Sequence, residues 1–197
     1  FDFTTMYTQL PHEALVRNVR RALEEIWSAV GARLGADDSI AAGTRGAESR
    51  ATLPWRISPT GWTLSAKGLT LDELMERIEW LVENIYVLNG SSLRRQVVGL
   101  PMGTNCAPEL ANLYCYQIER DFMEQNPEAP AHEPTYRYID DILTFCRRDE
   151  DPGLPSNIDY GMQYAETSGS DHTCTFLGMH IAVEEGQLIL AVNDKRD

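Results

Sequence analysis

The chain has 197 residues, of which 43% are hydrophobic and 24% charged, so its composition is that of an ordinary globular domain. Its formal net charge of −13 argues against a self-sufficient nucleic-acid binder, because such proteins are normally basic. No apolar run approaches the roughly 18–20 residues of a membrane span, and we expect no membrane partner.

The cysteines and histidines form no pattern typical of a zinc site or a disulfide framework. The four cysteines, at positions 106, 115, 146 and 174, include no CxxC pair, and the four histidines have no metal-ligand spacing with them. A reducing, intracellular compartment is therefore expected.

The first third of the chain predicts a strand, a helix and an insertion. Phe1–Tyr7 is a short apolar and aromatic run that predicts a buried strand. Apolar residues at helical spacing follow over Glu13–Val30. Residues 31–68 contain several glycines and prolines, and we interpret them as an insertion with short strands at Trp55–Ile57 and Trp62–Leu64.

The middle of the chain predicts two further helices with a strand between them. Thr70 and Glu73 form a capping box at the start of an amphipathic helix, and Asn89-Gly90 ends that helix. Arg94–Val98 is predicted to be a strand, and Pro108–Met123 has the apolar spacing of the second helix.

The last third predicts two hairpins and a short helix. Thr135–Ile139 and Ile142–Cys146 are strand-forming runs on either side of a tight turn, and Asn157–Glu166 is predicted to be a short helix. Thr173–Val183 and Gln187–Val192 have the pattern of two strands joined by a turn at Glu185-Gly186. The fold class expected from this order is α+β, with an antiparallel sheet backed by helices.

Two adjacent carboxylates, Asp140 and Asp141, lie at the turn of the first hairpin in the sequence YIDD. Two anionic side chains at one turn repel each other unless hard divalent cations lie between them, because Mg²⁺ takes oxygen ligands from one or two carboxylates. A solvated acidic turn is the alternative for an isolated Asp-Asp pair.

A third carboxylate, Asp2, lies on the strand predicted at the start of the chain, where an acid is costly unless it is paired or bound to metal. Strands from distant parts of a chain can be neighbours in one sheet. Asp2, Asp140 and Asp141 could then share two cations about 3.5–4 Å apart, which is the arrangement for in-line phosphoryl transfer.

Four segments resemble, in order, motifs A, B, C and E of the reverse transcriptase palm. They read FDFTTMYTQLPHEAL, RQVVGLPMGTNCAPELANLY, YRYIDDIL and TFLGMHI. The resemblance is closest to the Penelope-like branch of retroelements, which is similar to telomerase, and it covers nearly the whole chain. A lone YxDD motif is a weak signal, whereas four motifs in order are a strong one.

The resemblance implies a two-metal catalytic centre. It makes Asp2, Asp140 and Asp141 the catalytic residues and the ligands of two Mg²⁺ ions, with Mn²⁺ as an alternative. It makes Tyr7 an aromatic gate that clashes with a ribose 2′-hydroxyl and so favours dNTPs, whereas a plain core aromatic is the alternative.

The resemblance also implies where the substrates lie. The incoming dNTP would lie along Phe3, Thr4, Thr5 and Met6, with backbone N–H groups as donors. The loop Gly99–Gly103 would frame the templating base pair. Within it, Met102 can pack on a base, and Gly103 lets the backbone approach the nucleotide closely. The primer grip would be formed by Phe176, Leu177 and Gly178, for which a plain hairpin is the alternative.

Part of the family pattern is absent. Many polymerases of this class place a lysine after the YxDD motif as a general acid for pyrophosphate, but no lysine occurs between Asp141 and Lys195. His172 has suitable chemistry, and an exposed loop histidine is the alternative. Candidates for phosphate contact, each with a solvated surface side chain as the alternative, are Arg94, Arg95, Arg147 and Arg148.

Three hypotheses about function follow. The first is an RNA-directed DNA polymerase of a Penelope-like retroelement, acting on an RNA template, a DNA primer and dNTPs, in the nucleus. The second is a domesticated or telomerase-like reverse transcriptase that serves its host. The third is a non-catalytic palm that serves as a protein-interaction module, against which the three intact aspartates argue.

The chain starts at Phe1, inside motif A, and we therefore expect residues 1–197 to be a palm fragment without its fingers and thumb. Duplex affinity depends mainly on Lys and Arg contacts to phosphates. At a net charge of −13, the isolated chain is expected to bind primer–template poorly and to be inactive by itself.

Overall fold

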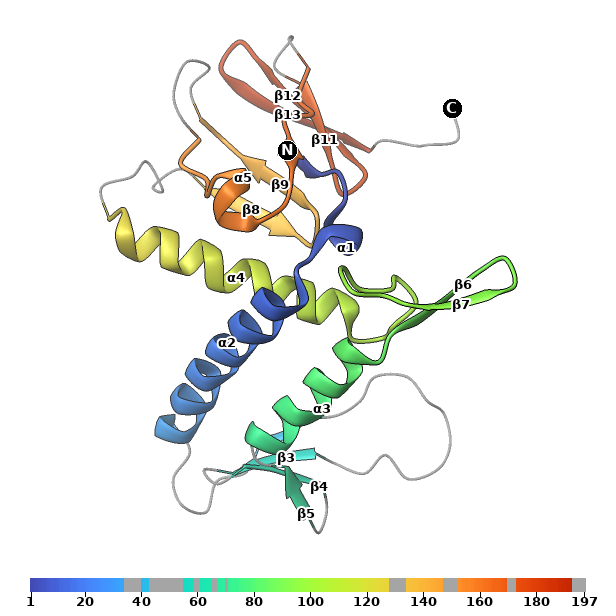
Figure 1. Cartoon of the computed structure of the whole chain (residues 1–197). Helices are drawn as coiled ribbons and strands as arrows, with labels where there is room; N and C mark the ends of the chain where they lie inside the picture. Colours follow the sequence, from blue (N-terminus) through green and yellow to red (C-terminus); the bar gives the residue numbers. More distant parts are fainter. Residues whose placement is uncertain are drawn as a thin grey trace. The chain divides into compact units, whose positions relative to one another are not determined.

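The computed structural model describes residues 1–33, 40–42, 55–58, 61–64, 67–69, 71–127, 134–146, 152–169 and 173–192 (Figure 1). The chain divides into two compact units, one made of Phe1–Pro11 with Pro101–Asp197 and the other of His12–Leu100. Helices and antiparallel strands occur together, so the predicted mixture of helix and antiparallel sheet is confirmed. Within the described ranges, no helix is long and apolar enough to cross a membrane.

The first unit contains a four-stranded antiparallel sheet built from distant parts of the chain. Its strand order is β10-β1-β9-β8. The strands are β1 (Asp2–Phe3), β8 (Thr135–Tyr138), β9 (Asp141–Thr144) and β10 (Tyr164–Ala165). The start of the chain thus pairs on one side with the YIDD hairpin and on the other with β10.

One face of this sheet is part of the core. Phe3 and Ile142 are 3% and 4% exposed. The Phe3 ring packs edge-on against the rings of Tyr160 and Tyr164, at centroid distances of 4.8 and 5.5 Å. Because side chains alternate along a strand, Asp2, the neighbour of Phe3, is directed to the opposite face.

Two helices complete this part of the first unit. Helix α4 (Ala107–Gln125) begins with a proline in its first turn and buries a stripe at helical spacing. Helix α5 (Asn157–Tyr160) starts with a capping box between Ser156 and Asp159 and ends at Gly161, whose φ of 62° is left-handed. The side chains buried along α4 are Ala107, Leu110, Ala111, Tyr114, Cys115 and Gln117.

A second antiparallel sheet, of order β11-β12-β13, follows in the first unit. Its strands are β11 (Thr173–Phe176), β12 (Met179–Glu184) and β13 (Gln187–Val192). Strand β11 contacts β9, so the predicted motif E lies beside the predicted motif C. Ile181 and Ala182 are buried, whereas β13 is exposed along its whole length.

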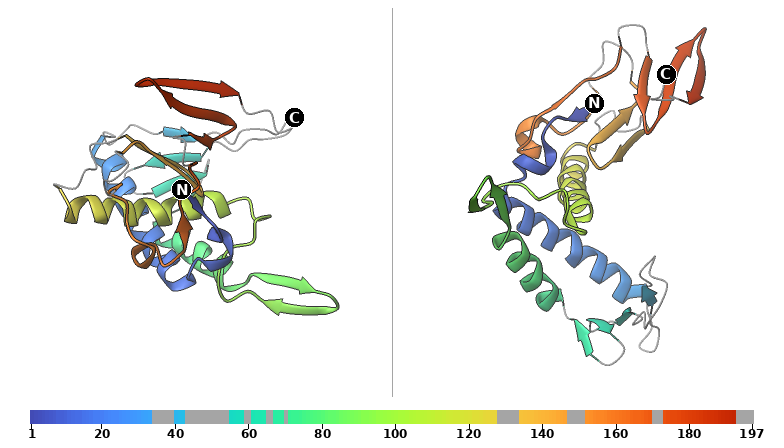
Figure 2. Two further views of the ribbon diagram at one scale, coloured as in Figure 1. Left: turned by 90° about the horizontal axis from the view of Figure 1, so that it is seen from above. Right: turned by 90° about the vertical axis from the view of Figure 1, so that its right-hand side faces the viewer.

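The second unit is organised around two long helices that lie side by side (Figures 1 and 2). Helices α2 (His12–Arg33) and α3 (Leu71–Glu83) pack through buried Leu15, Val19, Met75 and Val82. The guanidinium of Arg20 on α2 adds ion pairs to Asp72 and Glu79 on α3, at 3.0 and 3.5 Å.

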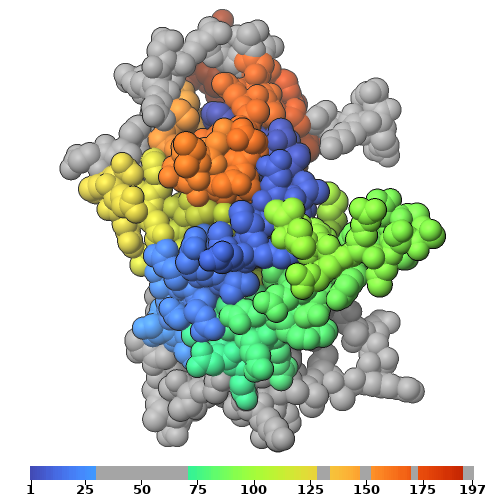
Figure 3. All heavy atoms as spheres, in the orientation of Figure 1, coloured from blue at the N-terminus to red at the C-terminus, as the bar shows by residue number. Residues whose placement is uncertain are grey.

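Two sheets flank these helices in the second unit. The strands β2 (Ile40–Ala42), β3 (Trp55–Ser58), β4 (Gly61–Leu64) and β5 (Lys67–Leu69) form an antiparallel sheet between α2 and α3 in sequence. The predicted strands at Trp55 and Trp62 are therefore confirmed. Strands β6 (Tyr86–Asn89) and β7 (Ser92–Arg95) form a hairpin that projects from this unit, in green in Figure 3.

Two predicted elements in the first two thirds of the chain were wrong in extent. The expected strand over Phe1–Tyr7 ends at Phe3, because the carbonyl of Thr5 accepts bonds from the N–H groups of Thr8 and Gln9 and starts helix α1 (Met6–Gln9). The helix predicted to begin at Thr70 ends at Glu83, and its predicted terminator Asn89-Gly90 lies in the β6–β7 hairpin. Asn-Gly is a strong hairpin signal, which the helical interpretation overlooked.

Two predictions in the last third were also wrong. The helix expected over Asn157–Glu166 stops after one turn, and β10 follows it. The strand expected over Thr173–Val183 is broken by a hairpin turn at Leu177-Gly178, where both residues have positive φ. Earlier in the chain, one element is wrong in position, because the predicted strand Arg94–Val98 lies at Ser92–Arg95. Thr70, the expected helix cap, lies outside the described residues.

Candidate active site

The predicted acidic turn is a two-residue hairpin loop. Tyr138 pairs with Asp141, which leaves Ile139 and Asp140 as the loop residues between β8 and β9. Ile139 has a φ of 56°, a conformation that a β-branched residue rarely adopts. Such a residue stores about 1–3 kcal/mol of strain, and strained residues of this kind cluster at functional sites.

Strand β1 places Asp2 directly opposite Asp141. The N–H of Phe3 donates to the Asp140 carbonyl at 3.1 Å, and the N–H of Ile142 donates to the Phe1 carbonyl at 2.9 Å. These bonds flank the Asp2–Asp141 pair, which is therefore a non-hydrogen-bonded pair with Cα atoms about 4.5 Å apart and side chains on the same face. Carboxylates from opposite ends of the sequence thus share one face of the sheet, with Asp140 next to them in the turn.

The donor chemistry of this face fits a hard divalent cation. Within the described part of the chain, neither the Asp2 nor the Asp140 carboxylate has a hydrogen-bond or ion-pair partner of its own. Carboxylate oxygens are the ligands that Mg²⁺ prefers. The carboxylates of Asp2, Asp140 and Asp141 do not converge on one point. Among the described residues, no group of three His, Cys, Asp or Glu side chains is close enough to hold one ion.

Tyr7 lies within electrostatic reach of the acidic turn. Tyr7 is the second residue of α1, and its side chain is half-buried. Burial raises the pKa of the Tyr7 hydroxyl, and the negative charges of Asp140 and Glu109 raise it further. The hydroxyl of Tyr7, the residue that the family resemblance makes the sugar gate, therefore stays protonated.

The structure corrects part of the expected triphosphate site. The side chains of Phe3 and Met6 are buried, at 3% and 2% exposure, and so belong to the core. The N–H of Phe3 donates to Asp140, and that of Thr4 donates to the Gln163 carbonyl at 3.3 Å. Two of the four expected backbone donors are therefore used inside the sheet, and of the motif only Thr5 and Met6 have N–H groups beyond the strand pairing.

Met102 and Gly103 lie on an open loop before α4. The Met102 side chain is 76% exposed. A Cβ atom at Gly103 would meet nothing within 4 Å, and the φ of Gly103 is not one that requires glycine. Neither the packing nor the backbone of this chain therefore requires a glycine at position 103. A bound nucleotide close to the backbone is a reason for glycine that fits this observation. Gly99, at the other end of the predicted loop, accepts a 2.7 Å hydrogen bond from His12 through its carbonyl.

The predicted primer grip is the turn between β11 and β12. Leu177 and Gly178 are the two loop residues, with φ of 50° and 78°, and the Leu177 side chain is half-exposed. Phe176 and Asp141 line the same small cavity of about 60 Å³ between β9 and β11. The structure therefore brings Phe176 near the acidic turn.

Some candidates have no described position. The loop arginines Arg147 and Arg148, the acidic residues that follow them, and His172 all lie outside the described residues.

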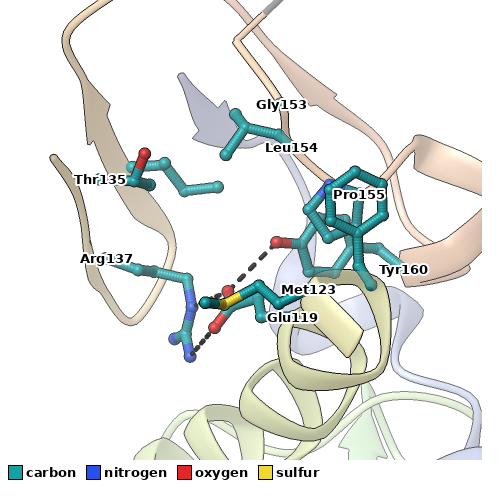
Figure 4. Close-up of a pocket in the computed structure, with 10 residues that line it drawn as sticks. Glu119, Met123, Thr135, Arg137, Gly153, Leu154, Pro155 and Tyr160 are labelled. Atoms are coloured by element: carbon teal, nitrogen blue, oxygen red, sulfur yellow. Dashed lines mark hydrogen bonds and ion pairs between the residues drawn. The ribbon is translucent and has the colours of Figure 1, made fainter. Parts of the chain in front are cut away.

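Sequence reasoning missed a largely buried arginine next to the acidic turn. Arg137, between Tyr136 and Tyr138, is only 11% exposed, and its guanidinium pairs with Glu119 on α4 at 2.5 Å (Figure 4). The available signal was the position of the arginine. Arg137 pairs with Ile142 across the hairpin, and paired side chains lie on the same face. Because Ile142 is apolar, Arg137 faces the same core.

Comparisons with known proteins identify the family and the fold. The family described as reverse transcriptase (RNA-dependent DNA polymerase) matches residues 68–175. The fold is similar to a solved structure of apo telomerase from Candida tropicalis truncated from the C-terminal domain, with a TM-score of 0.51 and 16% identity over 96% of this chain. The chain spans 34% of that telomerase chain. No curated protein matches the sequence. Since the family match covers more than half of its residues, this chain belongs to the reverse transcriptase family.

Proposed function

We propose that this chain carries the polymerising centre of an RNA-directed DNA polymerase, which transfers dNTPs to a primer 3′-hydroxyl on an RNA template. The observation that carries the proposal is the register of Asp2 opposite Asp141, beside the strained turn that presents Asp140. A sheet gains nothing from directly opposed carboxylates, because like charges in that position are destabilising. Their placement makes sense if cations and a phosphate substrate use them.

Asp2, Asp140 and Asp141 are proposed to hold two Mg²⁺ ions, with Mn²⁺ as an alternative. Such ions, when bound, would activate the attacking hydroxyl and stabilise the leaving pyrophosphate. The residues of the chain itself position the substrates. Tyr7 excludes the ribose 2′-hydroxyl, and the Leu177-Gly178 turn supports the primer beside the acidic face.

Met102 and Gly103 are proposed to contact the nascent base pair. The exposed Met102 thioether can pack on a base without a specific hydrogen bond, which suits a residue that meets every base in turn. The bare backbone at Gly103 leaves room for the nucleotide.

For the biological context we propose a Penelope-like retroelement, with residues 1–197 forming a polymerase palm, residues 31–68 as an insertion, and action in the nucleus. A telomerase-like host enzyme is the second candidate, and the similarity to the Candida tropicalis telomerase fold favours it. The flanking sequence of the full-length protein separates the two. An endonuclease next to this chain supports the retroelement, and a telomerase-like RNA-binding domain supports the host enzyme.

The test of catalysis is incorporation of dTTP on poly(rA)/oligo(dT) by the full-length protein, with Mg²⁺ or Mn²⁺. The change Asp140→Ala is expected to lower kcat on the order of 10³-fold or more, because metal catalysis supplies several kcal/mol and each ~1.4 kcal/mol is tenfold. Glu184→Gln, an exposed carboxylate on β12, is the matched control and should leave kcat unchanged.

Two results would count against the proposal. Full activity in Asp140→Ala removes the catalytic assignment. A wild-type protein that incorporates no nucleotide with varied primers and both metals supports instead the third hypothesis, a non-catalytic palm that binds protein.

A further inference from the structure

A largely buried arginine, Arg137, joins the proposed catalytic hairpin to helix α4. The Arg137 guanidinium donates to both carboxylate oxygens of Glu119, through Nε at 2.5 Å and Nη2 at 3.2 Å. It also donates to Asn112, to the side-chain Oδ1 at 2.6 Å and to the carbonyl at 3.3 Å. Its remaining contact is a bond from Nη1 to the carbonyl oxygen of Ile139, at 3.2 Å. One side chain thus connects α4 to the strained residue of the YIDD turn.

The Glu119 carboxylate, which accepts from Arg137, also accepts from a tyrosine. The Tyr160 hydroxyl donates to Glu119 at 3.1 Å, and the Tyr114 hydroxyl donates to the Tyr160 carbonyl at 2.7 Å. Burial raises the pKa of the Tyr160 hydroxyl, and the negative charge of Glu119 raises it further, so Tyr160 remains a donor. Figure 4 shows Arg137 and Tyr160 reaching Glu119 from opposite sides.

The Ile139 carbonyl is a sensitive point in the turn. The peptide between Ile139 and Asp140 is planar, so the direction of this carbonyl fixes the direction of the Asp140 N–H and the position of the Asp140 Cα. The φ of 56° at Ile139 is unfavourable for an isoleucine and persists only where its surroundings impose it. A charged hydrogen bond is of the same order as that strain and can therefore offset it.

Resting on the proposed polymerase function, we infer that Arg137 is a positioning residue for catalysis. It holds the Ile139 carbonyl, keeps Ile139 in its left-handed conformation, and so fixes where the Asp140 carboxylate stands. Glu119 and Asn112 orient the guanidinium fork, and Tyr160 orients Glu119. Arg137 itself touches no substrate, since its side chain is on the face of the sheet opposite Asp2 and Asp141.

A cavity lies beside the hydrogen-bonded cluster around Arg137. A cavity of about 210 Å³ adjoins the side chain, lined among others by Leu154, Pro155 and Met123 (Figure 4). A volume of that size holds several waters, because each water occupies about 30 Å³ in the liquid. A shorter cation at 137 can therefore be solvated without collapse of the surrounding structure.

Arg137→Lys separates positioning from folding. Lysine keeps the positive charge beside Glu119, but an ammonium lacks the planar fork that reaches Glu119, Asn112 and Ile139 together. In the full-length enzyme we expect kcat to fall roughly 10–100-fold, because a displacement of about 1 Å can cost 10²-fold. The KM for primer–template should stay within about twofold and the melting temperature should stay near the wild-type value. Arg120→Lys, an exposed arginine on α4 paired with Glu124, is the matched control and should change none of these.

A double-mutant cycle with Ile139→Gly tests the proposed route. Glycine adopts positive φ without strain, so the turn no longer needs Arg137 to hold it. Arg137→Lys should then lower kcat by no more than about threefold in the Ile139→Gly background. An equal loss in both backgrounds, or no loss in either, overturns the inference.

Hydrogen–deuterium exchange over residues 135–146 keeps the inference testable if the enzyme proves inactive. The amides of the turn should exchange at least about tenfold faster in Arg137→Lys than in wild type. Faster exchange in an inactive protein rejects the polymerase function but supports the inference that Arg137 keeps the turn in its conformation. Unchanged exchange rejects the hold itself, whatever the activity.

Discussion

Two hairpins in this chain have two-residue loops with the same left-handed first residue, but that residue is a glycine in one and an isoleucine in the other. The loop of β6–β7 is Gly90-Ser91 and the loop of β8–β9 is Ile139-Asp140. The first loop residue is left-handed in both, with φ of 62° at Gly90 and 56° at Ile139. Glycine takes that conformation at no steric cost, whereas isoleucine is strained in it. Of the two hairpins, β8–β9 is thus the one whose turn local residue preference does not explain.

The surroundings of the two hairpins explain how each turn is kept. Every residue of β6 and β7 is exposed, and among the described residues the backbone bonds of this hairpin are its own ladder and a bond from the Gln96 N–H to the Ile85 carbonyl at its base. The β8–β9 hairpin instead buries Ile142 and holds its loop carbonyl with Arg137. Of these two hairpins, the strained turn is therefore the one whose loop carbonyl accepts a bond from a charged side chain.

Removing the charge that supports the β8–β9 turn is expected to have the largest effect, and that effect is on the stability of the fold. Arg137→Met leaves the Glu119 carboxylate without its cation and should lower the free energy of unfolding by about 3 kcal/mol, the lower end for a broken buried pair because Glu119 is 28% exposed. For a chain of this size, that loss corresponds to roughly 6–12 °C in melting temperature. Thermal unfolding followed by circular dichroism measures it.

Arg94→Met on β7 is the matched control for that measurement. The Arg94 side chain is exposed, and an exposed substitution of this kind usually stays within about 0.5 kcal/mol of wild type. If the two variants lose equal stability, Arg137 does not support its hairpin in the way that the contrast requires.

Exchanging the turn residues should give opposite and smaller effects. Gly90→Ile should destabilise the β6–β7 hairpin by about 1–2 kcal/mol from conformation alone, since a Cβ at Gly90 meets nothing within 4 Å. Ile139→Gly removes a similar strain but adds about 0.5–1 kcal/mol of unfolded-state entropy, so its net effect on stability should be within ~1 kcal/mol of zero.

Hydrogen exchange of the β6 and β7 amides reports the first change and thermal unfolding the second. Exchange in Gly90→Ile should be roughly 5–30-fold faster than in wild type. A loss of more than about 1 kcal/mol in Ile139→Gly would show that packing by the isoleucine side chain, and not Arg137, keeps the turn.

The same contrast shows what the sequence can and cannot predict. Amphipathic spacing predicted α2, α3 and α4, because burial of one helical face is a local pattern. The acidic turn was also predicted, because Asp-Asp between two strand-forming runs is local. Arg137 was missed, because an arginine between two tyrosines has the pattern of an exposed edge strand, and only its contacts with α4 show that it is buried.

The short strands were misjudged for a related reason. β1 and β10 have two residues each, and their pairing depends on segments far away in sequence. The Asp2–Asp141 register needed that pairing, so the sequence predicted the three carboxylates without the geometry that relates them.

The smallest expected effect concerns nucleic-acid binding by the exposed hairpin. Residues 84–108 contain no Asp or Glu, in a chain that has 30 of them, and include Arg94 and Arg95. Arg95 pairs with Tyr86 and Arg94 with Val87, so the two arginines are on opposite faces of the hairpin. One nucleic-acid strand can therefore meet only one of them.

The double change Arg94→Gln and Arg95→Gln tests this binding in the full-length protein. It should weaken primer–template binding by a few-fold, and the slope of log K against log salt concentration should fall by about one, for one lost phosphate contact rather than two. Fluorescence anisotropy at several salt concentrations measures the slope, with Arg77→Gln, an exposed arginine on α3, as the control. An unchanged slope means that both arginines are only solvated. A fall of about two means that both reach phosphate, which the pairing of the hairpin does not allow on one strand.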